Sequence, residues 1–489
     1  GGSGRRGSAS PKPQTPERLR SQEDLRPSPR GPEVQQLPEH LRAAGAQDDE
    51  LERTKSEDPL TPSTNGTHRP PSPPPENTQP TAQGPTWVLG KQFEVLEGRM
   101  YFMSLRDESR LRELQDWTIR SGLRPDRIFF STDAMLLYYP FCADFGPLNF
   151  GAVFRFCRLA RAKLAEALQE DKKCVYYCSA DTRLRTNAAT LLGSFLVLEY
   201  GWSAEDAWRV FDFAGKSPFM GFRDASYEEE DSFRIEIKHV LQGLERAKNV
   251  GLINLNTFDL QEYEYYDHPV VADLHEIVPG RFVAFRGPKQ TRRRHSTHSV
   301  LLPQDYFEIF EKLKVSAVCR LNNRQYNEGD FTAAGFSHYD MYFEDCSTPT
   351  PAVVEKFFDM CKKEKGCIAV HCKAGLGRTG TLIAMWIMRK YKFTARQAIG
   401  FIRVMRPGSI LGPQQDFLQA HEKLLWEAGD PDLPNSPSAL GIQDNWGNRD
   451  SAEARAHAAR MARENTEAMN RHSRIDRGAE GLREGGAGG

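Results

Sequence analysis

The stretch CIAVHCKAGLGRTG, which spans Cys367–Gly380, decides the fold of the region around it. Its first residues, Cys367–His371, form a short apolar run that predicts a buried strand. The residues after Arg378 predict a helix, and the loop between strand and helix contains Gly375 and Gly377. A glycine-bearing loop that enters a helix can turn successive backbone N–H groups inward, which creates a cradle for an anion. The stretch therefore predicts a strand–loop–helix unit with an anion-binding loop at its centre.

Within that loop, Cys372 and Arg378 are separated by five residues. The N-terminus of the following helix adds positive potential, so it favours both a bound phosphate and the thiolate form of a cysteine. The planar guanidinium of Arg378 can hold two phosphate oxygens at once, which a lysine cannot do. The combination predicts a phosphate site with a nucleophilic Cys372.

A diverged copy of this unit lies about 190 residues earlier in the chain, where Cys178 follows an apolar run. An apolar helix is expected after the loop in both copies. Ser203 in the first copy and Thr394 in the second are then expected to cap a further helix. We infer a duplication in which each half is an α/β layer structure.

The composition separates a central body from two polar ends. No Phe, Tyr or Trp precedes Trp87, and 16 of the 31 prolines lie within the first 85 residues. Such a segment cannot bury enough apolar surface to offset its chain entropy. The predicted organisation is a disordered Pro/Ser-rich tail, a first domain, a linker, a second domain and a second disordered tail, at residues 1–86, 87–256, 257–270, 271–428 and 429–489.

Charge and cysteine pattern exclude several classes of protein. A net charge of −1 argues against a nucleic-acid partner. Nowhere do about 18 apolar residues follow one another, so no membrane span is expected. The nine cysteines all lie in the central region without a CxxC ladder, which argues against a disulfide scaffold or a zinc module. With no apolar signal-peptide core at the N-terminus, a reducing compartment is expected.

The motifs resemble those of the protein tyrosine and dual-specificity phosphatase superfamily. More narrowly, the chain resembles its mitotic-exit members, the cell-division-cycle-fourteen type. The wider resemblance rests on the phosphate loop and on four further stretches, Ala143–Asn149, Phe222–Tyr227, Asp345–Pro349 and Arg406–Gln415. It covers most of residues 125–428. It implies an α/β fold with two tandem phosphatase-like domains, each a central mixed sheet flanked by helices, joined by a linker helix, with only the second domain catalytic.

The resemblance also implies the roles of the catalytic residues. Cys372 would attack phosphorus and form a cysteinyl-phosphate, held by Arg378 and the loop amides. Asp345, in preference to its neighbour Glu344, would protonate the leaving oxygen and then activate water. Thr379, unless it is an ordinary residue of the first helical turn, would donate a hydrogen bond to the sulfur. No metal or cofactor is implied. The phosphate-binding residues would be Lys373, Ala374, Gly375, Leu376, Gly377 and Arg378, with Gln414, or Gln415 beside it, positioning the hydrolytic water.

The first copy lacks the catalytic spacing, because no arginine follows Cys178 after five residues and the loop glycines are missing. We predict that Cys178 is structural and that this domain recognises substrate. By resemblance, Asp181 and Glu264 would line an acidic groove, with Arg223 nearby. The acidic run Glu228–Asp231 either extends that groove or is simply solvated. The groove implies a preference for phosphoserine followed by proline and a basic residue further on, as made by cyclin-dependent kinases.

The expected function is that of a dual-specificity protein phosphatase in cell-cycle regulation. It would hydrolyse phosphoserine, phosphothreonine and phosphotyrosine in phosphoprotein partners, in the nucleus, the cytoplasm or both, including nucleolus, centrosome or spindle. A homodimer is left open. A phosphoinositide phosphatase would usually carry a second basic residue where this loop has Leu376, and a phosphoprotein-binding scaffold would need neither Cys372 nor Asp345. Two departures from the family pattern are Cys346, where glycine is usual, and the basic cluster Arg292–His295.

Overall fold

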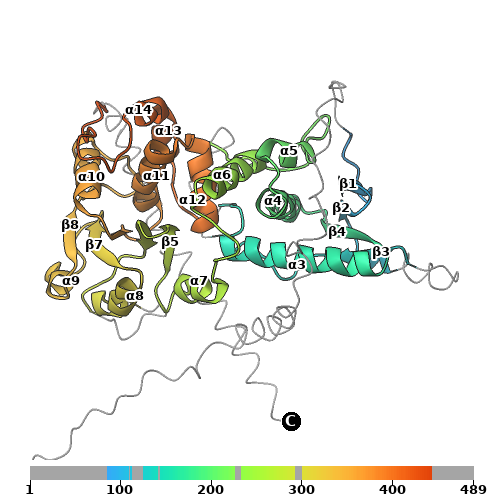
Figure 1. The fold of residues 1–489 in the computed structure, drawn as a ribbon, viewed down its shortest axis with the longest axis horizontal. Helices are drawn as coiled ribbons and strands as arrows, with labels where there is room; N and C mark the ends of the chain where they lie inside the picture. Colours follow the sequence, from blue (N-terminus) through green and yellow to red (C-terminus); the bar gives the residue numbers. More distant parts are fainter. Residues whose placement is uncertain are drawn as a thin grey trace, which may run out of the picture. The chain divides into compact units, whose positions relative to one another are not determined.

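The computed structural model describes residues 85–109, 111–112, 125–140, 144–225, 233–291 and 300–442 (Figure 1). Most of the two predicted disordered tails lies outside these residues. So do the acidic run at 228–231 and the basic cluster at 292–295. In the described part of the chain, no helix is long and apolar enough to cross a membrane.

The first domain contains a four-stranded sheet in the order β1-β2-β4-β3. β1 pairs antiparallel with β2, and β4 is parallel to both of its neighbours. The long helix after β4 lies at the centre of the core, since every residue from Arg185 to Leu198 is buried. The strands are β1 (Phe93–Leu96), β2 (Met100–Leu105), β3 (Arg127–Phe130) and β4 (Lys173–Ser179). The helices are α3 (Phe150–Gln169), α4 (Thr182–Leu198), α5 (Ala204–Arg209) and α6 (Ile237–Asn249).

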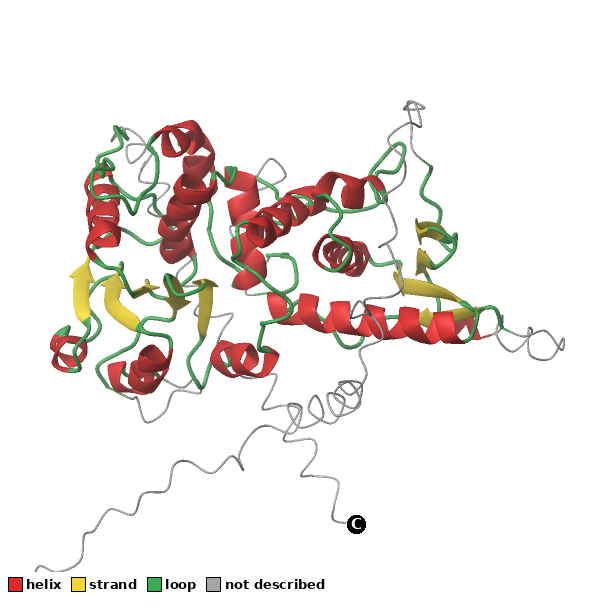
Figure 2. Ribbon diagram, viewed as in Figure 1, coloured by secondary structure: helices red, strands yellow, loops and turns green. Residues whose placement is uncertain are grey.

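The second domain contains a five-stranded sheet in the order β5-β6-β9-β7-β8, in which only β5 runs antiparallel to its neighbour (Figure 2). Its strands are β5 (Leu274–Val278), β6 (Phe282–Phe285), β7 (Val315–Arg320), β8 (Ser337–Asp340) and β9 (Cys367–His371). The linker contains α7 (Leu260–Asp267). The other helices are the 3₁₀ helix η3 (Pro303–Tyr306), α8 (Phe307–Lys312), α9 (Gly329–Ala333), α10 (Pro351–Lys363), α11 (Gly377–Tyr391), α12 (Ala395–Met405), α13 (Pro413–Ala420) and α14 (Glu422–Glu427).

Both faces of the second sheet are covered by apolar clusters. Because side chains alternate along a strand, Ile368 and Val370 of β9 join the cluster that includes residues of α10 and α11. Ala369 points the other way and packs with Phe310 of α8 and Phe331 of α9. Figure 1 shows α10 and α11 on one side of this sheet and α8 and α9 on the other. A fully buried parallel strand of this kind explains why Cys367–His371 reads as a continuous apolar run.

The two domains share one strand pattern, which matches the predicted duplication. In each, an antiparallel hairpin is followed by a strand that pairs in parallel with the hairpin's second strand, β4 with β2 and β9 with β6. The predicted caps also correspond. The side chain of Ser203 accepts from the N–H of Asp206, and that of Thr394 accepts from the N–H of Gln397.

The domains pack closely through α6 and α12, where each helix presents a glycine. A methyl group at Gly243 would lie 2.5 Å from the carbonyl oxygen of Gln397, and one at Gly400 would lie 3.1 Å from that of His239. Arg246 adds a polar contact, because its Nε and Nη2 donate to the carbonyl of Tyr391 at 2.8 and 2.7 Å. This contact leaves little room for the two domains to slide.

The second domain extends beyond the predicted boundary at residue 428, which is therefore too early. In the segment 429–442, the carboxylate of Asp432 accepts a hydrogen bond from Nε1 of Trp386 at 3.2 Å. Leu440 and Ile442 are buried in the main core cluster. The sequence hid this extension because the segment has no aromatic residue and several of its contacts are polar.

Candidate active site

The loop between β9 and α11 is held from behind by Arg406, which is almost fully buried. Its Nε and Nη2 donate to the carbonyls of Gly375 and Ala374, each at 2.9 Å. Nη2 also bonds to the carboxylate of Asp273 at 2.7 Å, so the guanidinium is itself fixed. In the sequence, Arg406 stood out only as part of a family motif. Its role in holding the loop was missed, because it lies about 30 residues after the carbonyls to which it donates.

The first two carbonyls of the loop are turned outward as well. The carbonyl oxygen of Cys372 lies 3.0 Å from Nδ1 of His371, and that of Lys373 accepts from the N–H of Gly287 at 3.3 Å. In a trans peptide the N–H points opposite to the carbonyl. Four successive N–H groups of the loop therefore face its interior, which is the arrangement that a phosphate cradle requires.

The two loop glycines have separate reasons to be there. Gly375 has φ +70°, and a methyl group on it would lie 2.1 Å from the carbonyl oxygen of Phe285, so no other residue fits. Gly377 begins α11, and a methyl group on it would lie 2.9 Å from Oε1 of Gln414. No side chain caps this helix, because Leu376 stands at the N-cap position. The positive end of the helix is therefore open toward the loop.

Arg378 and Asp345 meet at the mouth of this loop. Nη1 of Arg378 donates to the carbonyls of Phe343 and Leu321 at 2.8 and 3.2 Å, which fixes the guanidinium. Nη2 forms an ion pair with Asp345 at 3.0 Å, and Nε is buried without a partner among the described residues. Glu344, the alternative acid, instead hydrogen-bonds Tyr342. Asp345 is thus the carboxylate that the structure places beside the phosphate loop.

Cys372 and Thr379 are both buried where the loop enters α11, with exposed fractions of 2% and 0%. The hydroxyl oxygen of Thr379 has no hydrogen-bond partner among the described residues. An unpaired buried hydroxyl is costly, so it needs an acceptor nearby. The structure contains no hydrogen bond from this hydroxyl to the sulfur of Cys372, so the predicted bond stays a prediction.

The two glutamines at the start of α13 have different surroundings. Gln414 donates from Nε2 to the carbonyl of Ser347 at 3.0 Å, and its Oε1 would lie 2.9 Å from a methyl group on Gly377. Gln415 instead accepts from Nη2 of Arg403 at 2.8 Å, in the interior of the protein. Gln414 therefore lies between the phosphate loop and the loop that carries Asp345, and Gln415 does not.

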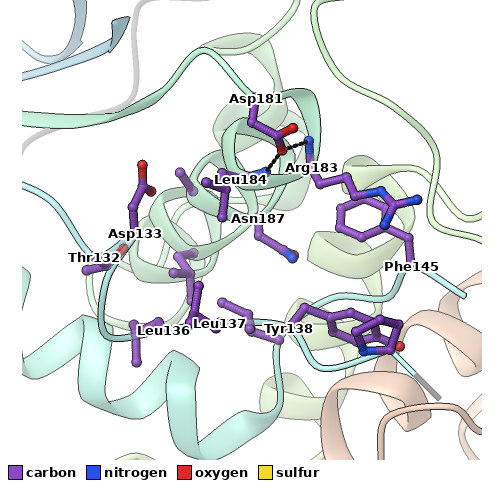
Figure 3. Close-up of a pocket in the computed structure, with 14 residues that line it drawn as sticks. Thr132, Asp133, Leu136, Leu137, Tyr138, Phe145, Asp181, Arg183, Leu184 and Asn187 are labelled. Atoms are coloured by element: carbon purple, nitrogen blue, oxygen red, sulfur yellow. Dashed lines mark hydrogen bonds between the residues drawn. The ribbon is translucent and has the colours of Figure 1, made fainter. Parts of the chain in front are cut away.

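In the first domain, the corresponding helix N-terminus is already filled by a side chain of the protein. The carboxylate of Asp181 accepts from the N–H groups of Arg183 and Leu184 at 2.8 and 3.0 Å, as Figure 3 shows. It thus takes the position at the start of α4 that a bound anion would need. This loop cannot bind phosphate in the way the second loop can.

Neither the cysteine nor the nearby arginine of that first loop is placed for catalysis. Burial raises the pKa of Cys178 to about 12, which keeps its sulfur protonated. The guanidinium of Arg185 is occupied by backbone carbonyls, since its Nε and Nη2 donate to that of Pro218 at 2.9 and 2.6 Å and its Nη1 donates to that of Ala180 at 2.9 Å. The prediction of a structural cysteine in a non-catalytic domain agrees with this geometry.

Sequence comparison gives the family to which these two domains belong. The family model for the N-terminal half of dual specificity protein phosphatases matches residues 94–247, and that for the dual specificity phosphatase catalytic domain matches residues 294–422. The chain is 43% identical over 302 residues to the human dual specificity protein phosphatase CDC14C, a match that covers 62% of this chain and 67% of that protein. The chain belongs to the CDC14 family of dual-specificity phosphatases.

Two other CDC14 relatives match over a larger share of this chain. Human CDC14A is 40% identical over 351 residues, which cover 71% of this chain and 57% of CDC14A. The Caenorhabditis elegans tyrosine-protein phosphatase cdc-14 is 36% identical over 338 residues, which cover 68% of this chain and 47% of that protein. The chain thus spans about half the length of these two relatives.

At one departure of this chain from the CDC14 pattern, the backbone has a conformation that favours glycine. Cys346, which follows Asp345 at the position where the resemblance leads us to expect glycine, has φ +59°. Glycine adopts this left-handed conformation without steric cost, whereas a side chain is strained there. Burial and the adjacent charge of Asp345 raise the pKa of Cys346 to about 12, so its thiol is neutral.

The predicted groove residues each have their own partner. Asp181 caps α4 at the edge of a cavity of ≈170 Å³ that is also lined by Asp133 (Figure 3). The carboxylate of Glu264 accepts hydrogen bonds from Nε and Nη2 of Arg155, at 2.8 and 2.7 Å. The backbone of Arg223 pairs with that of Phe145. Of the three, Asp181 lines the cavity described here.

Sequence reasoning also missed a buried hydrogen-bond chain behind the CDC14 phosphate loop. The hydroxyl of Tyr326 lies 2.8 Å from Nε2 of His371 and 2.9 Å from Nε2 of His338. Burial lowers the pKa of His371 to about 3 and that of His338 to about 4, so both rings are neutral near pH 7. Nδ1 of His371 faces the carbonyl of Cys372 and must carry the proton, so Nε2 accepts from Tyr326.

We expect Tyr326→Phe to slow alkylation of Cys372 by iodoacetamide at pH 6. Without Tyr326, the proton of the His371 ring can move from Nδ1 to Nε2, and Nδ1 then no longer donates to the carbonyl of Cys372. The unfolding free energy should fall by about 1–3 kcal/mol, since buried ring nitrogens lose their partner. Tyr176→Phe is the matched control, because it removes a buried hydroxyl 2.6 Å from that of Thr132 in the first domain. It should cost similar stability without changing the alkylation rate. Equal rates in both variants would contradict the prediction.

Proposed function

We propose that this chain is a cysteine-dependent dual-specificity protein phosphatase that prefers phosphoserine-proline sites with a basic residue downstream. The observation that carries the proposal is the loop at 372–378. Its carbonyls are bonded outward, its helix N-terminus is open, and Arg378 holds Asp345 at its mouth. A loop built only for packing would need none of these three features.

The first step follows from the positions of three groups. A substrate phosphate would bind the inward N–H groups and the Nε and Nη2 of Arg378, displacing Asp345 from the ion pair. The thiolate of Cys372 then attacks phosphorus while the bond to the serine or tyrosine oxygen breaks. Asp345, once protonated, gives its proton to the leaving oxygen.

The second step returns the enzyme to its starting state. A water molecule, oriented by Gln414, attacks the phosphorus of the cysteinyl-phosphate and gives a proton to Asp345. The phosphorus–sulfur bond breaks, and the hydroxyl of Thr379 stabilises the departing thiolate of Cys372. Inorganic phosphate is the product.

The cavity of the first domain supports recognition of a basic residue. Asp133 and Asp181 both line it, together with Arg183 and with apolar side chains such as Leu136 and Leu137 (Figure 3). Two carboxylates and the guanidinium of Arg183 leave these lining residues with a net negative charge, which together with the apolar side chains suits the aliphatic stem and charged end of lysine or arginine. Asp181→Asn provides a clean variant, because asparagine keeps the helix cap and removes the charge.

Phosphate release from matched phosphopeptides tests the proposal. We expect phosphoserine-Pro-x-Lys to be hydrolysed faster than phosphoserine-Ala-x-Lys and phosphoserine-Pro-x-Ala, with phosphotyrosine peptide and phosphoinositide micelles as further substrates. Asp181→Asn should reduce the preference for lysine and leave that for proline. Tight binding without turnover would mean a phosphoprotein-binding scaffold, and faster hydrolysis of the lipid would mean a phosphoinositide phosphatase.

A role in cell-cycle regulation, at nuclear or cytoplasmic sites, is part of the same proposal and is supported by membership of the CDC14 family alone.

A further inference from the structure

We propose that Asp224, a residue of the non-catalytic domain, is a positioning residue for hydrolysis of the cysteinyl-phosphate. Its carboxylate fixes the start of α13, the helix that carries Gln414. The inference rests on the proposed phosphatase function and adds to it a reason why the second domain needs the first. Asp224 acts through Gly412 and Gln414 and does not touch the phosphate.

The carboxylate of Asp224 is presented from a firmly held segment. Asp224 is 3% exposed, and the backbones of the two preceding residues, Phe222 and Arg223, pair with neighbouring segments of the first domain. From there, Oδ2 accepts a hydrogen bond from the backbone N–H of Gly412 at 2.5 Å. A residue of the first domain thus binds the backbone of the second, 188 positions away.

Gly412 is the point at which this bond controls the direction of the chain. It stands at the N-cap of α13 with φ +50° and ψ −127°, a conformation that favours glycine. No side chain of its own segment caps α13, and Pro413 follows directly. The bond from Asp224 therefore holds the N–H of Gly412, while the carbonyl of Gly412 accepts from Nε2 of Gln415 at 3.3 Å.

Two residues after Gly412, the side chain of Gln414 is fully buried and fixed at both ends. Its Oε1 accepts from the N–H of Leu411 at 2.9 Å, and its Nε2 donates to the carbonyl of Ser347 at 3.0 Å. A shift of Gly412 would move Gln414 relative to the phosphate loop. A displacement of about 1 Å in a positioning group can cost roughly 100-fold in rate.

A buried arginine holds the other end of the same segment. Arg403 donates to the carbonyls of Ser409 and Ile410 at 3.0 and 2.8 Å and to the amide oxygen of Gln415. Burial lowers the pKa of Arg403, and the negative charge of Asp224 acts in the opposite direction. Residues 409–415 are therefore held between a carboxylate from one domain and a guanidinium from the other.

The proposal predicts an effect on the second chemical step alone. In that step water forms the new oxygen–phosphorus bond, the phosphorus–sulfur bond breaks, and the proton goes to Asp345. Formation of the cysteinyl-phosphate uses neither the water nor Gln414. Slower hydrolysis lowers kcat and KM together and leaves kcat/KM unchanged, because kcat/KM reports only the steps up to the first irreversible one.

The test is rapid-quench kinetics of the full chain with a phosphotyrosine peptide or p-nitrophenyl phosphate. For Asp224→Ala we expect kcat and KM to fall together by roughly 10- to 100-fold. A burst of product close to one equivalent of enzyme should appear, and the phosphoenzyme should be trapped by acid. Asp224→Asn keeps an acceptor oxygen for the N–H of Gly412, so it should restore most of the rate.

Arg246→Met is the matched control, since Arg246 also joins the domains but binds Tyr391, away from this segment. It should show native kcat and no larger burst. An Asp224→Ala variant with native kcat, or with kcat/KM reduced as much as kcat and no burst, would overturn the proposal while the phosphatase function stands. A native chain that releases no phosphate would overturn both.

Discussion

Replacing Cys372 with serine is expected to lower phosphate release by at least roughly 10⁴-fold, because a serine hydroxyl in this loop is a far weaker nucleophile than a thiolate. Serine is also a poor leaving group for the second step. The rest of the loop is unchanged, so a phosphopeptide should still bind. Phosphate release and calorimetric titration with the same peptide measure the two properties separately.

Cys178→Ser is the control for the loss of a buried cysteine. Cys178 is fully buried near the end of β4, and its sulfur lies 3.7 Å from the carbonyl oxygen of Met103. We expect turnover within about twofold of native, because this loop is closed to phosphate by Asp181. If Cys372→Ser kept even a hundredth of native turnover, the nucleophile would have to be another residue.

Arg378→Lys is expected to lower kcat by about 10²–10³-fold, the range for loss of a fixed donor to transition-state charge. In the free protein the guanidinium bonds two carbonyls with Nη1 and Asp345 with Nη2, while Nε stays available for phosphate. A single ammonium group cannot keep the backbone bonds and also hold two phosphate oxygens. Steady-state kinetics with a phosphopeptide measure the effect.

Arg389→Lys on the same helix separates loss of catalysis from loss of stability. Arg389 is as deeply buried as Arg378, and it donates to the carbonyls of Gly429 and Ala428 at 2.8 and 2.9 Å. We expect a loss of about 1–3 kcal/mol in the free energy of unfolding and a native kcat. Equal losses of kcat in the two variants would mean that Arg378 serves only to stabilise the domain.

The phosphate loop could be predicted from sequence because its parts are contiguous. Residues 367–380 contain the apolar strand, the two glycines, Cys372 and Arg378. In so short a stretch, the chain must pass directly from the strand through the loop into the helix. The duplication was readable for the same reason, since each copy repeats a local order of strand, loop and capped helix. Gly375 illustrates the link, because its positive φ is a backbone conformation that glycine adopts without steric cost.

The supports of that loop come from distant parts of the chain and depended on tertiary structure. Arg406, Tyr326 and Asp224 show no periodicity or spacing to a partner, because their partners are brought near by the order of strands and the packing of α6 on α12. The choice between Gln414 and Gln415 also required the three-dimensional contacts, since adjacent residues on a helix point in different directions.

The sequence by itself placed a cysteine, two glycines and an arginine in one loop, which predicts a nucleophile and an anion cradle there, and it gave the first domain a loop without that spacing. Tertiary structure decided which groups surround that loop, and it brings the carboxylate of Asp224 in the first domain to the N–H of Gly412 in the second. The physical reason is that backbone conformation and helix polarity follow from neighbouring residues. Hydrogen bonds between remote groups exist only after the chain has packed.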